Sequence, residues 1–195
     1  MHAKPDLRVF LEWMIAGSDS VITDVITLNS IFIRMVTTAQ ILAERAMQLP
    51  CGEKCVDWAI RLLESGHESQ SAYRLAAKLR PHNHFELASL RDQVHTELNL
   101  ADTADVVAIC SYVAEILANS NENTLDAVLT EIKDIYLSND HEPIEIYDFY
   151  LLYFARADLK EQEFQYYWPD ATRDNIERIT NDRIREFIVE HGGSA

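Results

Sequence analysis

The chain is poor in helix-breaking residues, in cysteine and in basic residues. Among 195 residues there are only five Gly, five Pro and three Cys. So few cysteines exclude the disulfide framework of small secreted domains. Lys and Arg number 17 against 32 Asp and Glu, which gives a formal net charge of −15. This balance argues against a nucleic-acid binder, because such a protein must offer positive charge to phosphates.

Long uncharged apolar runs and an N-terminal targeting signal are also lacking. The first residues contain no apolar core followed by a small-residue cleavage site. The most apolar stretch, residues 21–47, is interrupted by charged side chains such as Asp24, Arg34 and Glu44. It therefore falls short of the roughly 18 uncharged residues that a membrane helix needs. We expect a soluble, cytoplasmic protein that does not bind membranes.

Apolar residues recur at helical spacing along most of the chain. One stripe of this kind consists of Val106, Ile109, Cys110, Val113, Ile116 and Leu117, a pattern typical of an amphipathic helix. No Ser/Gly-rich linker divides the chain, and the short connections favour antiparallel neighbours. We predict an all-α fold, with residues 1–195 as a single helical domain in the form of a bundle or short stack. The eight or nine predicted helices span about 5–16, 20–48, 53–65, 70–79, 85–98, 103–119, 124–138, 144–157 and 172–190.

Glycines punctuate these segments. Gly17, Gly52 and Gly66 each follow a periodic apolar segment. Because glycine tolerates the left-handed conformation that ends many helices, we predict a C-terminal cap at each of the three.

The excess of negative charge lies in the second half of the chain. Residues 1–100 carry 10 basic and 12 acidic side chains, whereas residues 101–195 carry 7 and 20. The same half is rich in aromatic rings, because ten of the 18 aromatic residues lie between Tyr136 and Trp168. This asymmetry is the feature that a function has to explain.

Four residues form a candidate metal site. Cys51 and Cys55 are four apart at a predicted helix start, and His82 and His84 could complete a tetrahedral site. Structural zinc sites use tighter cysteine spacing, so we interpret the cysteines as ordinary small residues at a turn and expect no metal. His82-Asn83-His84 has the residue order of the HNH nuclease motif, but no strand signals surround it. We interpret it as a loop in which Asn83 or His84 caps the next helix.

No motif supports catalysis. Glycine-rich phosphate loops, the Gly-x-Ser-x-Gly elbow and the His-Glu-x-x-His motif are all lacking. Carboxylates are plentiful, but a catalytic pair needs one member that burial keeps protonated. Helical spacing instead puts Glu145, Asp148, Leu152 and Arg156 on one outer stripe. We therefore predict no enzymatic activity and no cofactor.

The aromatic and acidic region is the candidate partner-binding surface. At least half of its rings should be structural, with Ile146, Phe149, Tyr150 and Tyr153 turned toward the core. Rings in the connection before the last helix, beside many carboxylates, have the composition of a protein-binding hot spot. The residues that we expect to contact a partner are Glu142, Glu145, Asp148, Tyr166, Tyr167 and Trp168.

The segment from Trp58 to Leu100 carries a resemblance. A helix ends at Gly66, Ser69-Gln70-Ser71 opens a short helix with Leu75-Ala76, and Phe85-Glu86 begins the next. This pattern resembles small, acidic, all-α bacterial proteins of unassigned function, some of them immunity proteins encoded beside secreted toxins. The resemblance implies a cytoplasmic, non-enzymatic and protective protein, and it assigns no functional residue.

These observations lead to two main functional hypotheses, and a third, an enzyme or metalloprotein that uses Cys51, Cys55, His82 and His84, ranks behind them. The first is a cytosolic immunity-type inhibitor whose acidic, aromatic C-terminal surface occludes a basic, toxin-like protein partner. The second is a homo-oligomeric helical scaffold or regulator in which the same rings are buried against another copy of the chain. Neither hypothesis involves nucleic acid or a membrane.

Overall fold

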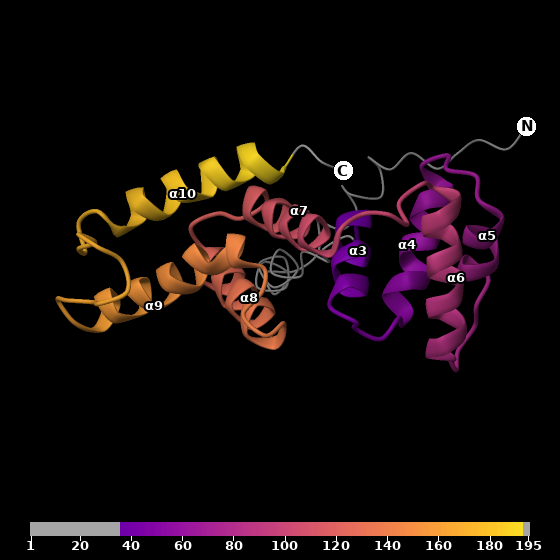
Figure 1. Ribbon diagram of the computed structural model, residues 1–195, viewed down its shortest axis with the longest axis horizontal. Coiled ribbons are helices and arrows are strands. Elements are labelled where there is room, and N and C mark those ends of the chain that lie inside the picture. Colours follow the sequence, from indigo (N-terminus) through magenta and orange to yellow (C-terminus); the bar gives the residue numbers. More distant parts are fainter. Residues whose placement is uncertain (1–35, 193–195) are drawn as a thin grey trace, which may run out of the picture. The chain divides into compact units, whose positions relative to one another are not determined.

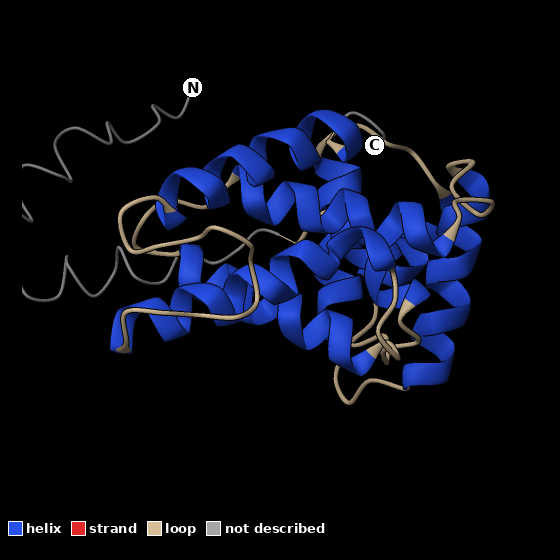
Figure 2. Cartoon of the chain, turned by 60° about the vertical axis from the view of Figure 1, so that its left-hand side comes forward, coloured by secondary structure: helices blue, strands red, loops and turns tan. Residues whose placement is uncertain are grey.

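A computed structural model describes residues 36–192, in which helices are joined by turns and loops (Figures 1 and 2). It contains eight α-helices, one 3₁₀ turn and, within those residues, no strand. The predicted all-α class is confirmed. In chain order the elements are α3 (Thr38–Ala46), α4 (Glu53–Glu64), α5 (Gln70–Ala76), α6 (His84–Glu97), α7 (Asp105–Ala118), α8 (Leu125–Ser138), η1 (Ile144–Ile146), α9 (Tyr147–Glu161) and α10 (Ile176–His191).

One predicted helix is too long. The apolar run of residues 20–48 predicts a continuous helix, but residues 36 and 37 are not helical. Thr37 has an extended backbone, and its hydroxyl accepts a hydrogen bond from the amide of Gln40, so it caps α3. A threonine side chain that satisfies a free amide in this way favours a helix start over a helix interior. The predicted helix 5–16, Gly17 and the first part of 20–48 lie outside the described residues, as does part of the predicted single domain.

The helix ends follow capping chemistry, with one correction. Gly66 ends α4 in the left-handed conformation, at φ +86°, and the amides of Gly66 and His67 bond the carbonyls of Leu63 and Leu62. This is the predicted glycine cap. Gly52, however, precedes α4 as its N-terminal cap residue, and the left-handed residue after α3 is Gln48, at φ +56°. The predicted C-terminal cap at Gly52 is therefore wrong.

Two groups of buried side chains hold the helices together. The smaller core lies among α4, α5 and α6, which pack side by side (Figure 1), and is centred on Trp58, Leu75 and Leu90. The larger core is built mainly from α7, α8, α9 and α10, around Val113, Ile132 and Phe149. Helix α3 contributes to both, since Ile41 belongs to the smaller core and Ala39 and Ala43 to the larger one. In residues 36–192, no helix has the length and apolar character needed to cross a membrane.

The smaller core contains a buried histidine. His95 on α6 is completely buried, and its ring lies edge-on to Trp58 with centroids 5.2 Å apart. Neither of its ring nitrogens has a hydrogen-bond partner within residues 36–192. Burial lowers the pKa of His95 to about 4, helped by the positive charges of Arg45 and Arg91 and opposed by Asp92. The ring is therefore neutral in the native protein at neutral pH.

This histidine makes stability depend on pH. The unfolded chain takes up a proton on His95 near pH 6.5, whereas the native protein does so only near pH 4. The contribution of neutral His95 to the free energy of unfolding is therefore fully present above pH 6.5 and is lost as the pH drops toward 4. We expect the free energy of unfolding of the native chain, relative to a His95→Leu variant, to fall by about 2 kcal/mol between pH 7 and 4.5. Urea unfolding at each pH measures this difference.

A matched variant separates this effect from general acid sensitivity. His67 is exposed on the loop after α4, so His67→Leu should leave the pH dependence of the native chain unchanged. A constant stability difference between the native chain and His95→Leu across this range would contradict the assignment.

Candidate partner-binding surface

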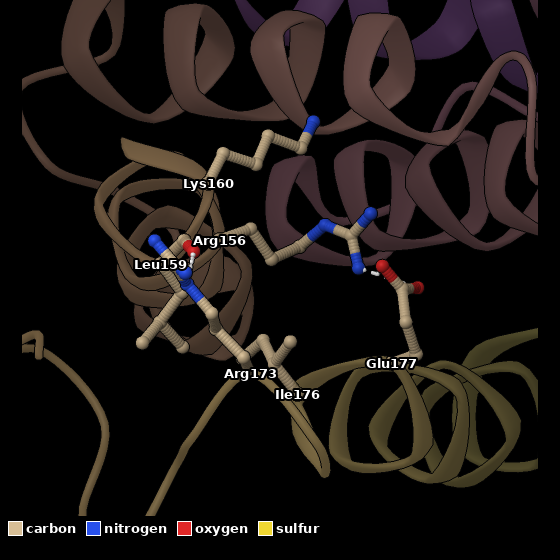
Figure 3. A pocket seen from close by; sticks show the side chains of 6 residues that line it. All are labelled: Arg156, Leu159, Lys160, Arg173, Ile176 and Glu177. Carbon is tan, nitrogen blue, oxygen red and sulfur yellow. Dashed lines mark hydrogen bonds and ion pairs between the residues drawn. The ribbon is translucent and has the colours of Figure 1, made fainter. Parts of the chain in front are cut away.

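An ion-pair network holds α9 between α8 and α10. Arg156 on α9 is buried, and its guanidinium bonds Asp126 of α8 at 3.2 Å and Glu177 of α10 at 2.7 Å. Lys160, one turn later, also pairs with Asp126. Burial opposes the charge of Asp126, but the bonds with Lys160 and Arg156 outweigh it and lower its pKa. Figure 3 shows Arg156 reaching Glu177 beside a pocket of about 130 Å³.

This network corrects the predicted orientation of α9. The sequence predicts an outer stripe through Leu152 and Arg156, but both side chains are buried. Arginine is normally a surface residue, and here it faces inward because two carboxylates meet it there. The opposite face of the helix consequently faces outward, and that face is aromatic.

Three rings on this outward face and one from the loop after α9 form a continuous row, which we call the aromatic ladder: Tyr147, Tyr150, Phe154 and Tyr167. Ring centroids are 5.9 Å apart between Tyr147 and Tyr150, 5.1 Å between Tyr150 and Phe154, and 5.1 Å between Phe154 and Tyr167. Tyr147 and Tyr167 are 37% and 38% exposed, and the two rings between them are half-buried. Stacked rings that remain accessible in this way supply rigid apolar area for contact.

The ladder rests on further aromatic side chains. Tyr136 of α8 is buried and lies 5.6 Å from Tyr147 and 5.2 Å from Tyr150. Ile146 and Phe149 are completely buried and Tyr153 is half-buried against the larger core. Tyr150 and Trp168 also pack against the larger core, so five of the ten rings in this region are structural, as expected.

The last ring of the ladder comes from the loop between α9 and α10, which Gln165 organises. The side-chain oxygen of Gln165 accepts hydrogen bonds from the amides of Tyr167 and Trp168, at 2.7 and 2.8 Å. Its nitrogen donates to the carbonyls of Trp168 and Ala171. The loop thus holds Tyr167 against Phe154, packs Trp168 on the larger core and leaves Tyr166 87% exposed. Among the expected aromatic contacts, Tyr166 and Tyr167 are accessible, and Trp168 is half-buried.

The three expected acidic contacts do not share one face. Glu142 is exposed just before η1, and its charge adds to burial and to the neighbouring Tyr147 and Tyr150 in raising the pKa of Tyr136, the ring on which the ladder rests. Asp148 faces α10, where it pairs with Arg183 at 2.7 Å. Glu145 is half-buried. Its charge acts on Cys110 instead of the ladder: burial of the Cys110 thiol, with the negative charges of Glu145 and Glu190, raises the pKa of that thiol to about 12. Glu142 is therefore the member of this group that flanks the ladder.

Two carboxylates that the sequence analysis missed lie on the same face of α9 as the ladder, beyond its rings. Asp158 and Glu161 lie eleven and fourteen residues after Tyr147, so helical geometry puts them on the same face. Their spacing from Tyr147 could have predicted this position, but the sequence analysis had placed the outward face of α9 along Leu152 and Arg156. We call Glu142, which precedes the ladder, together with Asp158 and Glu161, which follow it along α9, the flanking carboxylates.

The flanking carboxylates lack basic partners among residues 36–192. Every Lys and Arg between residues 101 and 192 is already engaged. Six of these side chains form ion pairs with other carboxylates, and the Nε of Arg173 donates to the carbonyl of Leu159 at 2.7 Å. No basic side chain of residues 36–192 therefore neutralises the negative charge beside the ladder.

Three of the four candidate metal residues have other partners, whereas the Nδ1 of His82 is buried without a hydrogen-bond partner among the described residues. Cys51 and Cys55 form a disulfide, which the sequence analysis did not predict. His84 Nδ1 donates to the carbonyl of Cys51 at 2.7 Å. Across the described part of the chain, no three His, Cys, Asp or Glu side chains come close enough to hold a metal ion. The Asn83 side chain accepts hydrogen bonds from the amides of Phe85 and Glu86, as the capping interpretation of this loop expects.

The Arg156 network should be the main polar support of the ladder. We expect Arg156→Ala to lower the free energy of unfolding by about 2 kcal/mol, because it removes a buried cation from two carboxylates that remain partly hydrated. Arg178 pairs with Asp182 on the surface of α10 and is 70% exposed. Arg178→Ala should therefore cost less than about 0.5 kcal/mol. Equal losses for the two variants in chemical denaturation would exclude the proposed role of Arg156.

The loop has its own test. Gln165→Ala removes four hydrogen bonds to the loop backbone, so chymotrypsin should cleave after Tyr166 or Tyr167 several-fold faster than in the native chain. Gln162 is exposed at the end of α9, and Gln162→Ala serves as the control. Mass spectrometry of the fragments identifies the cleavage site, and identical cleavage rates in both variants would show that Gln165 does not order the loop.

Comparison with known proteins adds no family to this description. No protein family model, no curated protein and no solved structure matches the chain. The resemblance of residues 58–100 to acidic all-α bacterial proteins stays a prediction. The aromatic ladder and its flanking carboxylates are the features from which a function can be argued.

Proposed function

We propose that this chain is a non-catalytic protein-binding module whose aromatic ladder and flanking carboxylates contact a basic protein. The observation that carries the proposal is the row of rings formed by α9 and the loop after it, with accessible rings at its two ends and carboxylates without ion pairs among the described residues beside it. Accessible aromatic area of this kind is characteristic of interaction sites.

The rings and the carboxylates would contribute in different ways. Tyrosine and other aromatic anchors supply much of the affinity at protein interfaces once a partner desolvates them. Carboxylates around the anchors act mainly on the rate of association and on the choice of partner, because their field attracts a cationic surface and repels an acidic one. A chain with a net charge of −15 would be strongly selective for basic proteins.

Steric occlusion is the mechanism that these features support. A basic groove that holds an acidic substrate could be covered by the ladder while its cations are neutralised by the flanking carboxylates. Residues 58–100 resemble acidic all-α bacterial proteins, some of them immunity proteins. Together with the occlusion mechanism, this resemblance makes an immunity-type inhibitor of a toxin-like protein our leading proposal. The corresponding localisation is the cytoplasm, a compartment in which the Cys51–Cys55 disulfide of the structure would be exposed to reduction.

Charge reversal at the ladder tests the proposal. The variant Glu142→Lys/Asp158→Lys/Glu161→Lys changes three flanking carboxylates, and lysine near the end of α9 is compatible with the helix dipole. We expect the basic protein that the native chain retains from an extract of its own organism to bind this variant at least about tenfold more weakly, with a flatter salt dependence. Titration with the purified protein at several salt concentrations measures both.

A second triple variant makes the same change in net charge elsewhere. Glu64, Glu68 and Asp102 are exposed and have no ion pair with described residues, so Glu64→Lys/Glu68→Lys/Asp102→Lys should bind like the native chain. If both variants lose affinity equally, overall charge rather than the ladder governs binding. Failure to retain any basic protein would contradict the proposed function itself.

A further inference from the structure

We propose that the partner element seated on the aromatic ladder is an amphipathic helix with basic residues at both ends. This inference rests on the proposed function and deepens it by naming the shape and charge pattern of the partner segment. It follows from the spacing of the flanking carboxylates, from the packing of the rings and from the repulsion that a second copy would meet.

The charge pattern sets the length of the partner segment. From Tyr147 to Glu161 the helix rises about 21 Å, at 1.5 Å per residue. Glu142 precedes this span, while Asp158 and Glu161 close it, and the middle of the row carries rings in place of charges. A helix of about 14 residues or more, apolar in its middle and basic at its ends, would match both the length and the sign of this pattern.

The packing of the rings favours a helix over other segments. Tyr147 stacks on Tyr150 with ring planes 17° apart, and Phe154 stacks on Tyr167 at 26°. Stacked rings leave little room between them for the prolines of an extended proline-rich peptide. The described residues also contain no strand, and so no sheet edge to which an extended segment could add. A ridge of side chains on a second helix can instead pack along the row, as helices do on one another.

A second copy of the chain fits this surface poorly. In a symmetric pair of α9 helices, carboxylates of one copy would face carboxylates of the other, whether the two helices ran parallel or antiparallel. The lysines and arginines of residues 101–192 that could relieve this repulsion are already engaged. Like charges held at both ends of an interface act against self-association.

Synthetic peptides test the inference with the full-length chain. The first peptide, of about 18 residues, carries Leu at helical spacing in its middle and two Lys at each end. The second peptide carries Glu in place of the terminal Lys. The third peptide is the first with one central residue replaced by proline, which breaks the helix. We expect the first peptide to bind at least tenfold more tightly than either of the others by calorimetry, and its circular dichroism to become helical on binding.

Protein variants locate the binding surface. Tyr147→Ala/Tyr167→Ala removes the two accessible ends of the ladder and should weaken binding of the first peptide at least tenfold. The control, Tyr73→Ala/Phe85→Ala, removes two rings on α5 and α6 that are 55% and 90% exposed, and it should bind like the native chain.

Each contrary outcome overturns a definite part of the inference. Equal binding of the proline-containing peptide would exclude a helical partner segment while leaving the proposed function intact. Equal binding of the Glu-ended peptide would exclude recognition by charge at the two ends. A stable dimer in light scattering that the ladder variant abolishes would assign the surface to a second copy.

Discussion

The orientation of α9 depends on one buried cation. Arg156 lies where α8, α9 and α10 meet, and it receives a carboxylate from each of the two neighbouring helices, Asp126 and Glu177. An arginine without these partners would have to leave the core and rotate the helix with it, because an unpaired buried charge is costly. Since it stays inside, Phe149, Leu152 and Ala155 are completely buried, and the opposite side of α9 exposes tyrosine and phenylalanine.

The ladder is thus a consequence of how charge is distributed in this half of the chain. Basic side chains are few, and the fold uses them to hold helices together: Arg156 and Lys160 bind α8, and Arg183 binds α9 to α10 through Asp148. The carboxylates left over include those beside the ladder. Rings fixed in advance by stacking and by the hydrogen bonds of Gln165 lose little conformational freedom when a partner covers them, so the geometry suits recognition.

Much of the fold could be predicted from the sequence because helical periodicity is a strong local signal. The stripe of α7 predicts its span closely, and the inward positions of Ile146 and Phe149 follow from the same spacing. The orientation of α9 as a whole could not be predicted, since apolar residues occur all around this helix and Arg156 has the type of a surface residue. The expected partner contacts were chosen from the wrong face of α9. For this reason they included Asp148, which faces α10, and left out Asp158 and Glu161. The roles of Gln165 and Thr37 could not be predicted either, because they depend on hydrogen bonds to backbone groups whose positions are set only when the chain has folded.

The central claim is that a protein partner covers the aromatic ladder. Hydroxyl-radical footprinting of the native chain, free and bound to its purified basic partner, tests it most directly, because tyrosine and phenylalanine react in proportion to their exposure. The account predicts strong protection of Tyr147, Phe154 and Tyr167 in the complex and unchanged oxidation of Tyr73 and Phe85. Protection confined to other side chains, with the ladder as reactive in the complex as in the free chain, would contradict it.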